Sequence, residues 1–151
     1  MIGDIVLQKR SGIVGWFVSL FTKSDYVHVG IDVGNDQIVH VYWFGKCIAD
    51  YRDWGDKILV LRLKNPLTTK QSVDLVCFAL TEPVKGYSFW NAIKSWRWKN
   101  TDDEKDSGHY NQCAEFVSRV YRKIGIDLVP NRSDDTTQPQ DFLTSPYLER
   151  R

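Results

Sequence analysis

Cysteine is scarce in this sequence of 151 residues, which contains only Cys47, Cys77 and Cys113. Three cysteines cannot all pair within one chain, and their spacing fits no zinc-binding motif. We therefore expect reduced thiols, as in a cytosol-like compartment, and neither a disulfide framework nor a metal site.

An excess of charge of either sign is also missing. Lys and Arg contribute 20 positive side chains, Asp and Glu contribute 19 negative ones, and the formal net charge is +1. No overall electrostatic field would attract a polyanion, although local patches can exist on a neutral protein. We expect no nucleic-acid partner.

Long apolar runs are absent. The most apolar stretch, residues 13–21, is far shorter than the roughly 20 residues that a membrane-spanning helix needs. The opening letters MIGDIVLQKR lack the charged segment and apolar run of a secretory signal peptide. The sequence thus predicts no integral membrane segment and a cytoplasmic location at synthesis.

Internal repeats and interdomain linkers are not visible either. The composition, 42% hydrophobic and 26% charged, is ordinary for a globular protein. A chain of this length can bury roughly two-thirds of its unfolded surface around one core. We expect residues 1–151 to form a single domain.

A hairpin that carries two histidines is predicted over residues 28–40, HVGIDVGNDQIVH. Apolar residues alternate along its first half, as one buried face of a strand requires. Residues 34–36, Gly-Asn-Asp, supply turn chemistry before a second apolar run. His28 and His40 then sit at equivalent ends of neighbouring strands, where one imidazole can orient the other.

A cysteine opens an amphipathic helix further along the chain, in the stretch NQCAEFV at residues 111–117. Cys113 would lie in the first turn, facing unpaired backbone N–H groups and the positive end of the helix dipole. This position lowers a thiol pKa when a basic partner assists. A thiolate there, with a histidine on a facing strand, is the papain-type arrangement for acyl transfer.

The hairpin resembles that of NlpC-type cell-wall peptidases, whose two catalytic histidines have the same spacing. In those enzymes the cysteine precedes the histidines, whereas here it follows them. This order resembles the circularly permuted papain-like group, which includes bacterial permuted amidases, related poxvirus proteins and the lecithin:retinol acyltransferase family. The segments GDIVL (residues 3–7), KGYSF (residues 85–89) and FLTSPYL (residues 142–148) resemble other parts of that group.

The resemblance implies an α+β, permuted papain-like (NlpC-like) fold, with helices packed on a mostly antiparallel sheet. It implies Cys113 as the nucleophile, His28 as its base and His40 as the orienting third member. Tyr87 matches by position a tyrosine that points at the cysteine and assists the oxyanion site. Hydrolases of this layout need neither a metal nor a cofactor.

The expected activity is cysteine-dependent hydrolysis of an amide bond, in a peptidoglycan peptide or an isopeptide-like substrate. Without a signal peptide, reaching the cell wall would require phage lysis or a dedicated secretion system. A lipid acyl hydrolase or acyltransferase is the alternative, because Cys-x-x-Phe-Val here resembles the NCEHFV signature of that branch. The signature is broken by Gln112 and by Glu115, which stands where the histidine would be. A non-catalytic binding module with a vestigial site is the third possibility.

Periodicity predicts the remaining elements. A polar loop at residues 99–108 is a candidate rim or lid, and residues 127–140 are expected as a tail that is ordered to loose. We expect strands at residues 4–8, 46–51 and 58–63 and helices at residues 13–21, 69–80 and 88–96.

Overall fold

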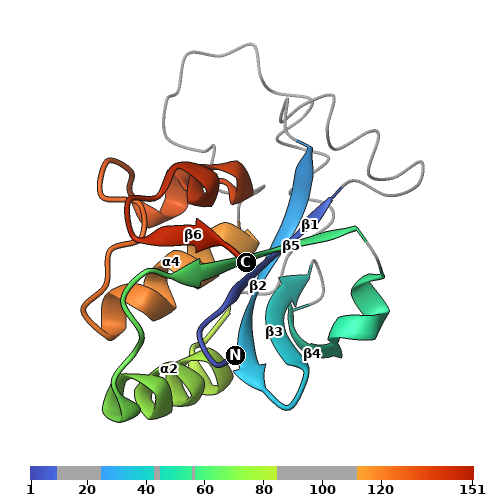
Figure 1. The fold of residues 1–151 in the computed structure, drawn as a ribbon, viewed down its shortest axis with the longest axis horizontal. Helices are drawn as coiled ribbons and strands as arrows, with labels where there is room; N and C mark the ends of the chain where they lie inside the picture. The colour runs from blue at the N-terminus through green and yellow to red at the C-terminus, as the bar shows by residue number, and fades with distance from the viewer. Residues whose placement is uncertain (10–24, 43–44, 56, 85–111) are drawn as a thin grey trace.

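A computed structural model describes residues 1–9, 25–42, 45–55, 57–84 and 112–151 of the chain. These residues form an α+β structure in which one antiparallel sheet carries two helices on one face (Figure 1). The strand order is β4-β3-β2-β1-β5-β6. The strands are β1 (Ile5–Lys9), β2 (Tyr26–Gly34), β3 (Gln37–Tyr42), β4 (Gly45–Asp50), β5 (Ile58–Leu63) and β6 (Leu148–Arg150).

Strand β1 lies inside the sheet because its side chains are apolar on both faces. It pairs with β2 on one side and with β5 on the other, antiparallel in both cases. Ile5, Val6 and Leu7 have no exposed surface. Ile5 and Leu7 join the large core beneath the helices, while Val6 joins a small cluster with Ile38 and Trp54 on the opposite face. The sheet is therefore covered on both faces.

The predicted hairpin is confirmed as β2 and β3. Asn35 and Asp36, the two turn residues, have φ values of 54° and 58°. Positive φ at two consecutive positions matches the twist of the flanking strands, and Asn and Asp tolerate it better than most residues. The turn fixes the register, so Gly30 faces His40 across the ladder.

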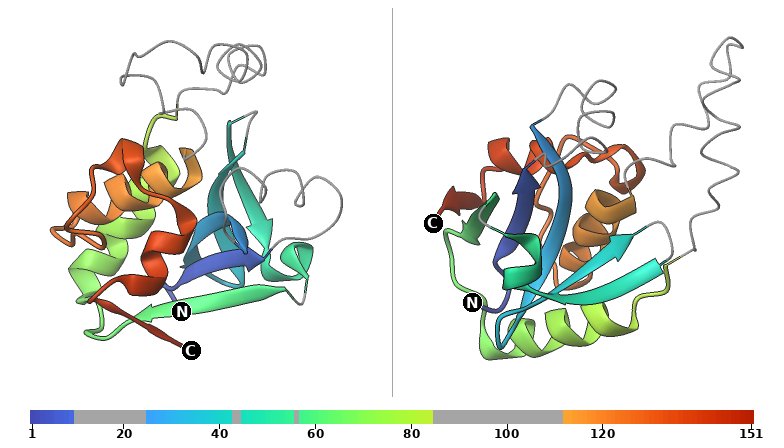
Figure 2. Two further views of the ribbon diagram at one scale, coloured as in Figure 1. Left: turned by 90° about the horizontal axis from the view of Figure 1, so that it is seen from above. Right: turned by 90° about the vertical axis from the view of Figure 1, so that its right-hand side faces the viewer.

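Helices α2 (Thr69–Thr81) and α4 (Gln112–Lys123) contact each other on the core face (Figure 2). Helix α2 starts where predicted, because Thr68 and Gln71 form a reciprocal capping box at its first turn. Helix α4 packs on β2 and β3, which sets its first turn near the histidine-bearing strands. In the part of the chain that the structure describes, no helix is long and apolar enough to cross a membrane.

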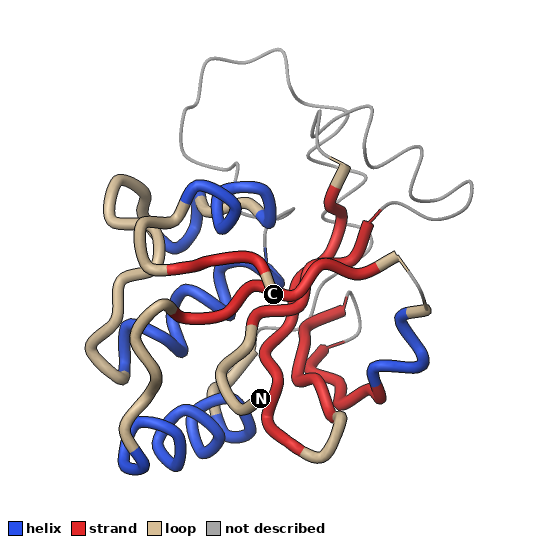
Figure 3. The backbone as a smooth tube through the Cα atoms, in the orientation of Figure 1, coloured by secondary structure: helices blue, strands red, loops and turns tan. Residues whose placement is uncertain are grey.

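The C-terminal segment, expected over residues 127–140 as a tail that is ordered to loose, packs on the core. Its short 3-10 helices, Asp134–Thr136 and Pro139–Thr144, are followed by β6, which pairs with β5 at the sheet edge (Figure 3). Leu128 and Phe142 are fully buried in the core and anchor the segment there. The prolines and polar residues left the degree of order open, and a few buried apolar residues decide the packing.

Several predicted elements lie outside the described residues. They are the helices at residues 13–21 and 88–96, the polar loop at residues 99–108 and the segment at residues 85–89. Their expected roles stay predictions.

Two buried carboxylates occupy the end of the sheet that is remote from the histidines. Asp4 accepts hydrogen bonds from Arg62 at 2.9 and 2.8 Å, and Asp32 accepts one from the Tyr51 hydroxyl at 2.6 Å. Burial opposes the charge of Asp4, yet the Arg62 hydrogen bonds hold its pKa below its usual value. Asp32 lies four residues beyond His28, about 13 Å along β2. These carboxylates are too distant to orient the histidine.

Replacing Gly30 by alanine should destabilise the fold. A Cβ atom there would lie 2.4 Å from Ile38 Cγ2, 3.0 Å from the Val39 carbonyl oxygen and 3.1 Å from His40 Cβ. Relieving those contacts must displace β3, so we expect urea denaturation to report a loss of about 1–3 kcal/mol. The control is Ile48→Ala on the same sheet, where the side chain is exposed. Equal stability of Gly30→Ala and wild type would contradict the packing.

Candidate active site

The two hairpin histidines contact each other directly. His28 lies two residues before Gly30, and Gly30 pairs with His40, so both imidazoles project from the same face. His28 Nε2 and His40 Nδ1 are 2.9 Å apart, and the rings are perpendicular with centroids 5.1 Å apart. Gly30 lies on this face between the two histidines, where an added Cβ would come within 3.1 Å of His40 Cβ. The contact between the imidazoles confirms the pairing that the hairpin spacing predicted.

Two aromatic rings enclose the histidine pair. The Tyr42 ring stacks on His28, with centroids 4.6 Å apart and planes inclined by 24°. The Trp54 ring lies 5.2 Å from His28 and 5.1 Å from His40. A 3-10 helix (Tyr51–Trp54) presents Trp54, and the Asp50 side chain caps that helix. Both imidazoles are therefore buried between apolar surfaces.

Burial makes both histidines weak bases. It lowers the pKa of His28 to about 3, with a further contribution from the positive charge that His40 would carry. Burial also lowers the pKa of His40 to about 4. Desolvation penalises the imidazolium form, and no carboxylate contacts the rings to offset that penalty among the residues described. Both rings are neutral at pH 7.

The sheet forks beside the histidines. Strand β2 begins at Tyr26 and β3 ends at Tyr42, yet the β2–β3 ladder stops at the pair Gly30–His40. Beyond this pair, β2 continues along β1 and β3 continues along β4 (Figure 2). The two arms of the fork carry His28 and Tyr42.

Cys113 lies at this fork, in the first turn of α4. Its sulfur is approached by the backbone N–H groups of Val29, Ala114 and Cys113 itself. Val29 is the first β2 residue beyond the last pair of the ladder, and it adjoins His28. On the other arm, the charges of the Cys47 and Cys113 sulfurs add to burial in raising the pKa of Tyr42. The sulfur thus lies beside the β2 arm, and its charge also acts on Tyr42 of the β3 arm.

The protonation state of Cys113 differs from the one expected. A thiol at a helix start was predicted to have a lowered pKa, and three N–H groups do act in that direction. Burial outweighs them, since Cys113 is 7% exposed, and it raises the pKa to about 11. At rest Cys113 is therefore a neutral thiol, and both imidazoles are neutral as well. This direction depends on tertiary packing, which the helix pattern alone does not contain.

Other residues that the sequence singled out have varied positions. Tyr87, the expected oxyanion residue, lies outside the described residues. Cys47 pairs with His40 across β3 and β4, and Cys77 is exposed on α2. Sequence reasoning missed two residues of the site, Tyr42 and Trp54. The two-residue period of the strand could have identified Tyr42 beside His40, but no local pattern connects Trp54 with the hairpin.

The described residues do not fit a bound metal. No group of three or more His, Cys, Asp or Glu side chains among them is arranged to hold an ion. His28 Nε2 and His40 Nδ1 also bind each other, which leaves one nitrogen on each ring.

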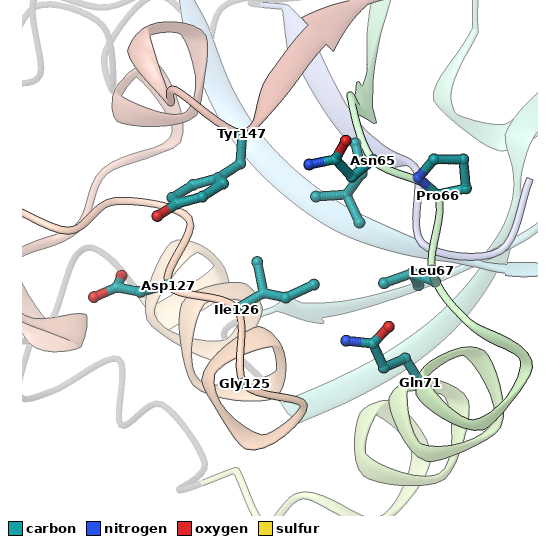
Figure 4. Close-up of a pocket in the computed structure, with 9 residues that line it drawn as sticks. Asn65, Pro66, Leu67, Gln71, Gly125, Ile126, Asp127 and Tyr147 are labelled. Carbon is teal, nitrogen blue, oxygen red and sulfur yellow. The ribbon is translucent and has the colours of Figure 1, made fainter.

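A surface pocket of about 260 Å³ lies away from the histidines, next to the residues that follow α4 (Figure 4). Cys113 lies in the first turn of α4 and Lys123 ends the helix, so the two residues are about 15 Å apart along the axis. Gln71 and Asp127 of this pocket already bind Thr68 and Arg122. The pocket lining is Leu63, Asn65, Pro66, Leu67, Gln71, Gly125, Ile126, Asp127 and Tyr147.

Comparison with known proteins places the fold. No protein-family model matches the sequence. The chain is similar to "Probable lipoprotein peptidase YaeF" of Escherichia coli (strain K12), with 25% identity over 95 residues. This match covers 61% of the chain and 34% of that protein, so it spans about a third of the relative's length.

A solved structure matches the whole chain. It is the crystal structure of the metalloprotein yiiX from Escherichia coli O157:H7, with a TM-score of 0.67 and 19% sequence identity. The match covers 100% of this chain and 96% of that one. The chain therefore has the expected α+β, permuted papain-like fold, with helices packed on an antiparallel sheet.

Acid should destabilise the protein through the histidine pair. Both histidines have folded-state pKa values below the ordinary 6.5. Below pH 6.5 they therefore bind protons in the unfolded chain while they stay neutral in the folded protein. Stability is therefore complete above pH 6.5 and falls as the pH drops toward 4. Urea denaturation should show a loss of roughly 2–4 kcal/mol between pH 7 and pH 5.

A double variant, His28→Gln with His40→Asn, is the control for this pH dependence. It should unfold with a flatter dependence on pH over the same interval, whatever its stability at pH 7. An identical slope in wild type and double variant would contradict neutral buried histidines.

Proposed function

We propose that this protein is a cysteine-dependent acyl hydrolase that cleaves an amide bond. Cys113 is the nucleophile, His28 is the base and His40 orients His28. The observation that carries the proposal is the His28–His40 contact of 2.9 Å beside a fork where the first turn of α4 places the Cys113 thiol. A nucleophile, a base and an orienting partner are the parts that acyl transfer requires.

The comparisons support a peptidase-like hydrolase. The relative YaeF is named as a probable lipoprotein peptidase, and the fold matches over the full chain. For this chain we propose a peptidoglycan peptide or an isopeptide-like amide as the substrate.

The neutral resting state sets the order of proton transfers. For His28 to accept a proton at Nδ1, its Nε2 must carry hydrogen and donate to His40 Nδ1. The Cys113 thiol passes its proton to His28 Nδ1 as sulfur adds to the amide carbonyl carbon. His28 then protonates the leaving amine as the carbon–nitrogen bond breaks, which yields a thioester.

Water completes the reaction. His28 removes a proton from water as it attacks the thioester, and the sulfur leaves with that proton to restore the thiol. The backbone N–H of Cys113 is available to the developing oxyanion because the nucleophile begins a helix. The assisting role of Tyr87, which the family resemblance implies, stays a prediction.

The substrate class can be tested by covalent trapping. Wild type and Cys113→Ala are incubated in parallel with muropeptides and with labelled phospholipid, and intact-mass spectrometry follows both adducts and products. We expect wild type to release amino groups from muropeptides and to carry a peptidyl adduct on Cys113. Cys113→Ala should lose at least about 1,000-fold in rate, because no other group forms the thioester.

Two outcomes would contradict this assignment. A fatty-acyl adduct on Cys113, with muropeptides intact, would favour the lipid acyl hydrolase or acyltransferase, which the Cys-x-x-Phe-Val match also suggests. No Cys113-dependent turnover of either substrate would favour a binding module.

His40→Ala should slow the reaction without abolishing the adduct, since it changes the orientation of His28 and leaves the nucleophile in place.

A further inference from the structure

Tyr42 stands at the mouth of the fork. It is the last residue of β3, two positions after His40, and its side chain lies on the histidine face. Its ring covers one face of His28, yet 39% of the residue remains exposed. Tyr42 thus lies between the buried histidines and the surface from which a substrate must approach.

Burial raises the pKa of Tyr42, and negative charge on the Cys47 and Cys113 sulfurs raises it further. An ionised phenol would therefore oppose a thiolate at Cys113, whereas a phenol that keeps its proton can donate a hydrogen bond to negative charge. At neutral pH the group acts as a hydrogen-bond donor.

When the sulfur attacks a carbonyl carbon, negative charge develops on the oxygen bonded to that carbon. Backbone N–H groups at a helix start provide one side of such a site, and a second donor from a side chain commonly completes it. Tyr42 ends β3 on the arm of the fork across from β2, the arm whose Val29 N–H approaches the sulfur.

We propose that the Tyr42 hydroxyl donates a hydrogen bond to the substrate carbonyl oxygen when Cys113 adds to it. Tyr42 is then a catalytic residue of the acyl transfer, and the inference rests on the function proposed above. The phenol keeps its proton throughout, so no additional proton acceptor is required. Its ring has a second role, since stacking on His28 fixes the plane of that imidazole.

Paired variants separate the two roles. Tyr42→Phe retains the ring on His28 and removes the donor, whereas Tyr42→Leu removes both. The probe is p-nitrophenyl acetate, whose burst of p-nitrophenolate reports acylation of Cys113. We expect Tyr42→Phe to slow acylation about 100-fold, with less than a threefold change in KM. The fall of its acylation rate at low pH should match that of wild type, because the ring at position 42 still covers His28.

Tyr42→Leu should slow acylation further and move this fall to higher pH, since an uncovered His28 regains solvation and a higher pKa. Tyr147→Phe, which removes an exposed hydroxyl at the pocket beyond α4, serves as the matched control and should acylate as fast as wild type. An unchanged acylation rate in Tyr42→Phe would overturn the assignment and leave the proposed function standing. A wild type whose burst matches that of Cys113→Ala would instead overturn the proposed function, and Tyr42 with it.

Discussion

The candidate site depends on one interruption in the sheet, the end of the β2–β3 ladder at Gly30 and His40. If the two strands stayed paired to their ends, backbone hydrogen bonds would close the gap beside Cys113. Because they separate, the N–H of Val29 can face the sulfur instead of a strand. Gly30 also matters here, because an added Cβ would crowd Ile38 and His40 on the neighbouring strand.

Burial determines which groups of the site carry a proton at rest. The usual account of a cysteine–histidine pair is a thiolate held by an imidazolium, which would place two charges between Trp54, Tyr42 and the core. Desolvation makes both charges expensive here, and the pKa values move apart, to about 11 for Cys113 and about 3 for His28. In the proposed mechanism the charge appears only during reaction, where the oxyanion donors can stabilise it. The enclosure that weakens the resting base also excludes competing water.

In the proposed mechanism a histidine is the orienting partner, because the buried acids lie too far from His28 to take that role. Asp4 and Asp32 are bound to Arg62 and Tyr51 at the far end of the sheet. A neutral partner costs less to bury than a carboxylate, and it can accept the Nε2 hydrogen of His28 through Nδ1. The same neutrality leaves the pair sensitive to acid.

Sequence patterns predicted the parts of the fold that local chemistry determines. Alternation placed the strands, the Asn35–Asp36 turn set the hairpin register, and Thr68 marked the start of α2. The fork, the enclosure by Trp54 and the docking of the C-terminal segment arise from contacts between distant segments. Periodicity records which residues face a core, and it does not record how deeply a thiol lies within one. The pKa direction of Cys113 was therefore wrong in the prediction.

The central claim is that Cys113, His28 and His40 act as one catalytic group. A crystal structure of the full chain tests it most directly, through the distance from Cys113 Sγ to the Nδ1 atom of His28. The account predicts a separation within about 4 Å, with His40 Nδ1 still bound to His28 Nε2. A sulfur turned into the core, with His28 Nδ1 bonded to another group, would contradict it.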